Sequence, residues 1–232
     1  MYKKLFFLAI MAMSLSLAAQ DCNLFIPLEQ NKGLQYQNFN RRDRLESTQD
    51  IMIREVIHHD NKTQAVVSSK FYDSRDRFLH EGEYSVFCSG DKLVMDMSAL
   101  FDQEMMQTLE HVSVNMSGDG LTIPNTISVG DELPDAQMDM ELTANNIKIS
   151  EIKILTQNRK VEGMENITTP AGTFESYKVT YKNVIRTHTL GMTVSNNSKV
   201  VEYFAPGIGS VRTEFYDDRD RLQSYTVLSK IY

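Results

Sequence analysis

Several residue types are scarce in this chain of 232 residues, which has two cysteines, five prolines, eleven glycines and no tryptophan. Two cysteines are too few for a disulfide-scaffold mini-protein or a four-cysteine zinc module, and the low proline and glycine content excludes a collagen-like chain. Positive charge is also scarce, since 24 lysines and arginines stand against 31 acids and the net charge is −7. We therefore expect no nucleic-acid partner. The 41% hydrophobic content is typical of a globular protein with one or at most two domains.

The common catalytic and metal-binding motifs are missing too. The chain has no Gly-x-Ser-x-Gly elbow, no His-Glu-x-x-His pair and no phosphate-binding Gly-Lys-Ser/Thr loop. His58 and His59 are adjacent, but consecutive residues of a strand point to opposite faces and cannot easily hold one ion. We therefore expect a protein that is not an enzyme and that has no cofactor and no metal site.

The amino terminus has the pattern of a secretory signal peptide: a cationic start, an apolar run of about 15 residues and small residues at the end. A membrane-spanning helix needs about 20 apolar residues, and no later run is long enough, so we expect no membrane span. The pattern predicts a signal peptide over 1–19, a single β domain over 20–232, and an exported protein that is periplasmic or secreted. Lipid attachment at Cys22 is the alternative, but Gln20 and Asp21 stand where such sites usually have small residues.

Export makes the two cysteines informative. An oxidising compartment favours a disulfide between Cys22 and Cys88, the only cysteines in the chain. By the chain-entropy model, such a bond would stabilise the fold by about 4 kcal/mol. A reactive thiol is the other interpretation, but the chain has no Cys-x-x-Cys pair that would favour it.

From residue 34 onward, short runs rich in Val, Ile, Thr, Tyr and Phe alternate with clusters of Asn, Asp, Ser and Gly, which is typical of strands and tight turns. One stretch differs, because Ser98 can cap a short helix near 98–111. We expect a mainly β fold, in which an antiparallel meander forms a curved sheet or a partly open barrel or roll. The expected strands are 51–57, 63–72, 83–88, 92–97, 146–156, 174–184, 200–204, 209–216 and 223–231.

A short motif occurs three times: an aromatic residue, Asn or Asp, any residue, Arg-Asp-Arg and an apolar residue. Its copies are Phe39–Leu45, Tyr72–Phe78 and Tyr216–Leu222. The Asn or Asp side chain can accept a hydrogen bond from the backbone two residues on and so open a type I turn. The Asp of Arg-Asp-Arg then takes the left-handed position that Gly normally occupies. We expect a positive φ at Asp43, Asp76 and Asp220, and we expect the first two turns to lie on one rim of the sheet.

Four stretches resemble the TapB-like family of exported bacterial β proteins, which is related to a domain-of-unknown-function group. They are Pro27–Tyr36, Ser128–Asp135, the Thr-Pro-Ala-Gly-Thr-Phe run at 169–174 and the Ala-Pro-Gly-Ile-Gly run at 205–209. The resemblance covers most of residues 24–232 and departs from the family in using Asp where relatives more often have Gly in the turns. It implies an all-β envelope protein and brings no settled activity and no catalytic residues.

Methionine supplies one candidate site. Met95 and Met97, and likewise Met138 and Met140, stand two residues apart and would share one face of a strand. With Phe101 and Met105, they would line an adaptable apolar pocket for a lipid-like or other hydrophobic molecule, which needs a cavity of at least about 300 Å³. Simple core packing is the main alternative, and binding of Cu(I) by Met sulfur is a further one.

The Arg-rich turns supply the second candidate site, although their charges nearly cancel and would attract an anion only weakly. Together these observations favour a non-enzymatic envelope protein that binds a hydrophobic or amphiphilic ligand in the concave interior of its sheet. The alternative is a module that binds another envelope protein through a sheet edge or through the rim of Arg-Asp-Arg turns.

Overall fold

The computed structural model describes residues 28–59, 62–90, 92–96 and 112–232. Strands fill most of this part of the chain, and the expected helix near 98–111 lies outside it. Among the described residues, there is no helix long and apolar enough to cross a membrane. The strands are β1 (Gly33–Asn40), β2 (Leu45–His59), β3 (Lys62–Asp73), β4 (Phe78–Ser89), β5 (Lys92–Met95), β6 (Val112–Gly118), β7 (Leu121–Pro124), β8 (Glu132–Leu133), β9 (Ala136–Ala144), β10 (Ile147–Thr169), β11 (Gly172–Thr189), β12 (Met192–Ala205), β13 (Gly209–Tyr216) and β14 (Leu222–Ile231).

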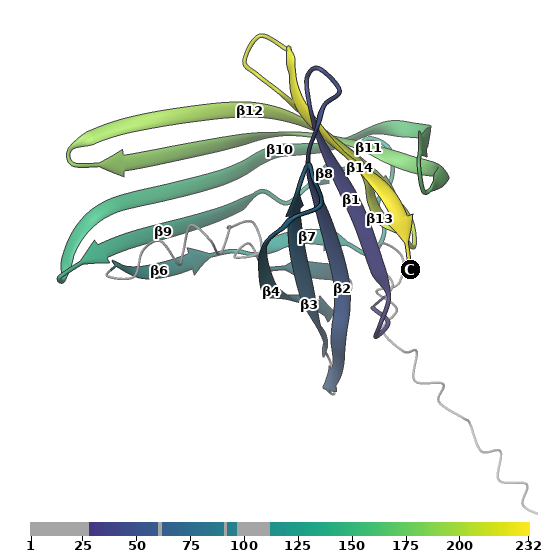
Figure 1. Ribbon diagram of the computed structural model, residues 1–232, viewed down its shortest axis with the longest axis horizontal. Helices are drawn as coiled ribbons and strands as arrows, with labels where there is room; N and C mark the ends of the chain where they lie inside the picture. The colour runs from purple at the N-terminus through teal and green to yellow at the C-terminus, as the bar shows by residue number, and fades with distance from the viewer. Residues whose placement is uncertain (1–27, 60–61, 91, 97–111) are drawn as a thin grey trace, which may run out of the picture.

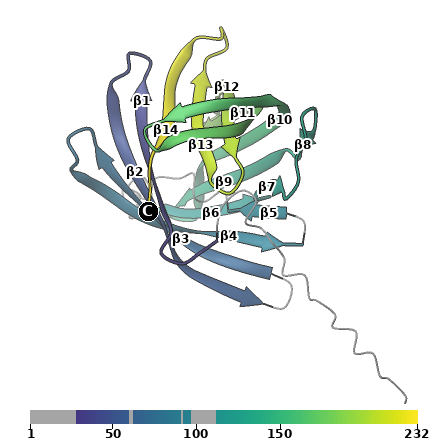
Figure 2. The same cartoon turned by 90° about the vertical axis from the view of Figure 1, so that its right-hand side faces the viewer.

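All of these strands belong to one antiparallel sheet, which confirms the mainly β prediction. Its order is β6-β9-β10-β11-β12-β13-β14-β1-β2-β3-β4-β5-β7, and β8 pairs with β10. The sheet is strongly curled: β1–β4 run across the direction of the long strands β9–β12 in Figure 1, and the curl is seen from its side in Figure 2. It is not closed by hydrogen bonds. However, the strands at its two edges, β6 and β7, are consecutive in the chain and only Asp119 and Gly120 separate them.

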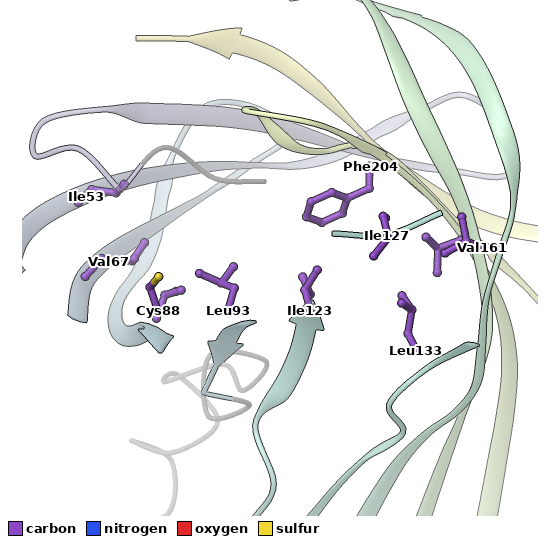
Figure 3. Close-up of a cluster of buried hydrophobic side chains, with 12 residues drawn as sticks. Ile53, Val67, Cys88, Leu93, Ile123, Ile127, Leu133, Val161 and Phe204 are labelled. Carbon is purple, nitrogen blue, oxygen red and sulfur yellow. The ribbon is translucent and has the colours of Figure 1, made fainter. Parts of the chain in front are cut away.

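The main core lies on the concave face of the curl. Residues that pair directly across antiparallel strands share a face, so Val67 lies beside Tyr84 and Cys88 lies beside Leu93. Figure 3 shows the row of buried side chains, from β2, β3 and β4 at one end, through β5 and β7, to β10 and β12 at the other. The members of this core are Ile53, Ala65, Val67, Val86, Cys88, Leu93, Ile123, Ile127, Leu133, Val161, Val179 and Phe204. Full burial of each large side chain contributes roughly 1.5–3 kcal/mol.

A second core lies on the other face of β12. Val201 and Tyr203 alternate with the inward residues of that strand and pack with Val211 and Leu228. The end of the β10–β11 hairpin packs against them through partly buried residues such as Phe174. The turn of that hairpin contains Gly172, which has a φ of 142°.

The three Arg-Asp-Arg turns form as predicted. Asp43, Asp76 and Asp220 have φ values of 57°, 62° and 54°, in the left-handed region that L-residues seldom occupy. The carboxylate or amide oxygens of Asn40, Asp73 and Asp217 each accept a hydrogen bond from the backbone N–H two residues on, at 2.9, 2.8 and 2.9 Å. Each turn is thus a type I turn followed by a left-handed bulge residue, which suits the twist of a hairpin.

All three turns lie on the same rim of the sheet. Ser224 of β14 pairs with Asn40 of β1, and Ser47 of β2 pairs with Asp73 of β3, so the hairpins β13–β14, β1–β2 and β3–β4 stand side by side. The first and third turns project together at the top of Figure 1. The prediction for the first two turns is therefore confirmed, and the third joins them because β14 pairs with β1.

Several strands are longer than expected. β10 runs to Thr169 rather than ending at 156, and β12 begins at Met192 rather than at 200. β10 continues because a bulge around Asn158, which has a φ of 55°, absorbs the polar stretch there. β12 begins earlier because its polar first half pairs along its whole length with β11.

A candidate site in the concave interior

The structure describes only some of the residues that were predicted to line a methionine-rich pocket. Met138 and Met140 lie on the concave face of β9 and are 4% and 1% exposed, as alternation predicts. Met95 is partly buried and packs against the main core. Met97, Phe101 and Met105 lie outside the described residues, so the ligand pocket built from all six residues stays a prediction.

A pocket of about 250 Å³ lies where the chain crosses from β6 to β7, and Met138 and Met116 line part of it. Phe87 and Val94 line the rest of its apolar wall, and they alternate with the buried core residues of β4 and β5. Met116 and Met138, by contrast, come from the concave side of β6 and β9, so the pocket lies at the link between the two edge strands rather than on one face of the sheet. Of the predicted methionine site's residues that the structure describes, Met138 lines this pocket.

An arginine stands inside the curl of the sheet. The bulge at Asn158 turns Arg159 of β10 inward, where its side chain is 4% exposed. Its Nη1 donates hydrogen bonds of 2.7 and 2.8 Å to the backbone oxygens of Thr122 and Pro134, so it ties β10 to β7 and to the end of β8. Its Nε is buried and has no hydrogen-bond partner, which is costly for a charged donor. Burial lowers the pKa of Arg159, against the attraction of Glu202.

Glu202 of β12 is the carboxylate that faces this arginine from across the interior. Glu202 pairs with Val179 of the main core, so it points to the concave side. The Tyr181 hydroxyl donates a hydrogen bond of 3.2 Å to Glu202 Oε2. Burial raises the pKa of Glu202 above its ordinary value, and the opposing attraction of Arg159 does not cancel that effect.

Tyr36 and Tyr84 complete the group. The Tyr36 hydroxyl donates a hydrogen bond of 2.8 Å to the backbone oxygen of Ser210. Burial is the main cause that raises the pKa of Tyr36, and the nearby Tyr84 and Glu202 add to it. Burial alone raises the pKa of Tyr84 to about 12. Within the described residues, the Tyr84 hydroxyl has no hydrogen-bond partner.

We call Arg159, Glu202, Tyr181, Tyr36 and Tyr84 the interior polar cluster. Burial is the largest cause that raises the pKa of Glu202 and of each tyrosine in this cluster. Each of these four residues is nevertheless only partly buried. Electrostatic interactions link the group, since Glu202 acts on Arg159, Tyr181 and Tyr36, and Tyr84 acts on Tyr36. The arrangement is suited to binding a polar group and leaves two donors for it, Arg159 Nε and the Tyr84 hydroxyl.

A cavity of about 600 Å³ opens beside Arg159 at the bulge of β10. Its walls are polar as well as apolar, and the backbone N–H of Asn158 donates a hydrogen bond of 2.9 Å to Asp135 across it. The lining residues are Glu132, Leu133, Pro134, Asp135, Asn158, Arg159 and Lys160. Among the residues that the structure describes, no three His, Cys, Asp or Glu side chains are placed to hold a metal ion.

The interior polar cluster was not predicted from the sequence. Arg159 stands in an Asn-Arg-Lys run that is typical of an exposed turn, and its inward orientation depends on acceptors from β7 and β8. The one available signal was Glu202, a lone charge within the apolar run of residues 200–205. Such a charge needs a partner when it is buried.

Several charged side chains on the rim of Arg-Asp-Arg turns form ion pairs with one another. Arg77 bonds Asp73 and Arg221 bonds Asp217, each at 2.6 Å. Lys199 bonds Asp220 at 2.8 Å. These ion pairs are exposed, so they contribute little to stability. Because the paired charges neutralise one another, the rim has little net charge with which to attract an anion.

A family model described as DUF3108-like matches residues 29–228, which include the curled sheet and every member of the interior polar cluster. The chain belongs to the DUF3108-like family. No curated protein matches it. The narrower TapB-like name has no support from these matches.

Two solved structures share the fold of this DUF3108-like chain. One, from Bacteroides fragilis NCTC 9343, is described as a protein inferred to be exported, with a YmcC-like fold; it is 24% identical, with a TM-score of 0.68, and the match covers 90% of this chain and 99% of that one. The other, described as an inferred lipoprotein from Parabacteroides distasonis ATCC 8503, is 21% identical, with a TM-score of 0.72 and coverage of 91% and 100%. At these levels of sequence identity, the similarity establishes a shared fold.

Proposed function

We propose that this protein is a non-enzymatic binding protein of the cell envelope that holds a small amphiphilic molecule in the concave interior of its sheet. The observation that carries the proposal is Arg159 Nε, a buried donor of the interior polar cluster that has no hydrogen-bond partner. The Tyr84 hydroxyl, which forms no hydrogen bond within the described residues, is a second donor available to a ligand. A buried donor without a partner is rare in folded proteins and is explained when a ligand supplies the acceptor.

The two donors define the polar end of the ligand. A carboxylate or phosphate oxygen would satisfy Arg159 Nε with a charge-assisted hydrogen bond. The apolar end has a matching surface, because Met138, Ile154 and Ile185 form a cross-strand row on the same face. Ile154 precedes the bulge that carries Arg159 by a few residues, so a head group at Arg159 would place an acyl chain along this row.

Two observations support a location in the cell envelope. The residues over 1–19 have the pattern of a signal peptide, and the solved relatives are described as inferred to be exported or lipid-anchored. A soluble exported form and a form that is lipidated at Cys22 would both place the binding site in the envelope.

Native mass spectrometry of the processed protein, freed of co-purified lipid and mixed with dodecanoate, dodecyl phosphate or dodecyl maltoside, tests the proposal. We expect the two anionic amphiphiles to bind and the neutral maltoside to bind at least tenfold more weakly. Tyr84→Phe removes a hydroxyl that has no partner in the fold, so it should weaken dodecanoate binding about tenfold without loss of stability. Failure of all three probes to bind would overturn the proposal.

Tyr177→Phe is the matched control, since Tyr177 packs against the same core and its hydroxyl has no hydrogen-bond partner among the described residues. We expect its affinity for dodecanoate to equal that of the parent protein. Equal losses in the Tyr84 and Tyr177 variants would show that the hydroxyl of Tyr84 is not a ligand contact.

The alternative, an interaction module, has one feature in its favour, namely the three turns on one rim. Arg42, Arg75 and Arg219 occupy the same position in each turn and form no ion pair within the described residues. If the rim binds an envelope protein, replacing all three with Ser should abolish its in-cell cross-linking to that partner while dodecanoate binding is retained.

A further inference from the structure

Four large apolar side chains stand in solvent at one end of the sheet. Leu190, Met192 and Val194, at the end of the β11–β12 hairpin, are 84%, 70% and 68% exposed, and Ile147, at the end of the neighbouring β9–β10 hairpin, is 68% exposed. Both hairpin ends project away from β1–β4, at the left of Figure 1. We call these four residues the apolar tip.

The turn at Leu190 places a leucine in a backbone conformation that is unfavourable for that residue. Leu190 and Gly191 have φ values of 51° and 80°, the pattern of a type I′ turn, whose first position usually holds Asn, Asp or Gly. The neighbouring β9–β10 turn also has two positive φ values, 51° and 61°, but at Asn145 and Asn146. A leucine in the left-handed conformation is strained, so its presence at an exposed position indicates a role other than stability.

The charge around the tip also differs from that of the rest of the protein. Residues 182–199 contain Lys182, Arg186 and Lys199 and no acidic residue, although the whole chain has a net charge of −7. Lys182 and Arg186 form no ion pair within the described residues, whereas Lys199 bonds Asp220. The acids of the adjacent strands are largely neutralised, since Lys148 bonds both Glu141 and Glu151 and Lys153 bonds Asp139.

We propose that the apolar tip inserts into the interfacial region of a lipid bilayer that contains anionic lipids. A few exposed apolar side chains and nearby unpaired cations are sufficient for reversible binding to such a surface. A second copy of this chain is a poorer fit, because a stable dimer buries roughly 800 Å² on each partner, and two narrow hairpin ends offer little flat area.

Co-sedimentation of the processed protein with vesicles of phosphatidylcholine containing about 30% phosphatidylglycerol tests the proposal. We expect binding that falls at least fivefold in vesicles of phosphatidylcholine alone, and again when Lys182 and Arg186 are both replaced with Gln. Leu190→Asn should lower binding at least fivefold. The same substitution installs a residue that suits the turn, so its melting temperature should equal or exceed that of the parent protein.

Leu79→Asn is the control, because Leu79 is 46% exposed on β4, away from the tip. Its vesicle binding should equal that of the parent protein. The proposal is overturned if the parent protein does not sediment with the anionic vesicles or if the Leu190 and Leu79 variants bind alike. It is also overturned if sedimentation velocity shows a dimer that Leu190→Asn dissociates while vesicle binding is absent. None of these results depends on a ligand in the concave interior.

Discussion

The Tyr225 hydroxyl donates a hydrogen bond of 2.9 Å to the carboxylate of Asp43, although 182 positions separate the two residues. The bond ties the first Arg-Asp-Arg turn to β14. The third turn has a comparable bond from Lys199 to Asp220, at 2.8 Å. Asp76 has the same backbone conformation in the second turn, but its side chain has no hydrogen bond within the described residues.

Asp76→Gly should therefore leave the protein as stable or make it more stable by up to about 1 kcal/mol, because Gly relieves the left-handed strain at a modest entropic cost. Urea unfolding at neutral pH measures the change. Asp43→Gly is the comparison, and it should be less favourable because it also removes the bond from Tyr225. A substantial loss of stability in the Asp76 variant would contradict the turn assignment.

The carboxylate of Asp73 predicts a particular dependence on pH. Hydrogen bonds from the backbone and side chain of Arg77 lower the pKa of Asp73 from its ordinary value of 3.8 to about 2. A depressed pKa stabilises the folded protein above the unfolded pKa, and this contribution disappears as the pH falls toward 2. Asp73→Asn should thus be less stable than the parent protein at pH 5 and equally stable near pH 2.

The first turn shows why this substitution isolates the charge. Asn40 occupies the equivalent position and accepts the same pair of backbone hydrogen bonds, so Asn at 73 can keep the turn while losing the ion pair with Arg77. Unfolding in urea at pH 5 and pH 2 compares the two proteins. A difference that persists unchanged at pH 2 would assign the effect to geometry rather than to ionisation.

The buried carboxyl group of Glu202 predicts a pH dependence of stability opposite to that of Asp73. Burial raises its pKa above the ordinary value of 4.5, so the ionised form is disfavoured in the folded protein. Glu202→Gln should then be more stable than the parent protein at pH 7, and the gain should vanish as the pH falls through about 4.5. Thermal unfolding across pH 4 to 8 measures it. A variant that is less stable at pH 7 would mean that the attraction between Glu202 and Arg159 outweighs desolvation.

The disulfide stays a prediction, because Cys22 lies outside the described residues. Cys88 is 1% exposed in the main core. Peptide mapping of the processed, unreduced protein should find Cys22 and Cys88 in one linked fragment, and reduction should lower the free energy of unfolding by about 4 kcal/mol. Alkylation of both thiols in denaturant without a reductant would refute the pairing.

Local features of the fold were predictable from the sequence. The conformations of Asp43, Asp76 and Asp220 follow from a few neighbouring residues, because each turn is closed by its own Asn or Asp side chain. The inward placement of Met138 and Met140 follows from alternation alone. The extent of β10 and β12 was not predictable, since polar runs continue as strands only when a neighbouring strand pairs with them.

The interior polar cluster could not be derived for a related reason. Arg159 points inward because a bulge reverses the alternation of β10, and its acceptors come from Thr122 and Pro134, which are remote in sequence. Tyr36 and Tyr84 also stand in runs that predict strands but say nothing about which residues meet inside the curl. The cluster forms only when the curl of the sheet brings distant strands together, so only the structure could show it.

The short link through Asp119 and Gly120 has a consequence for how the protein is assembled. Strands β1–β5 and strands β9–β12 lie toward opposite margins of the sheet, and the two strands that this link joins, β7 and β6, are the outermost strands of those margins. Neither margin is complete until residues from both halves are in place, so we expect the halves to fold cooperatively. A protease cut at this link would uncouple the margins and leave unpaired backbone where another chain could add a strand.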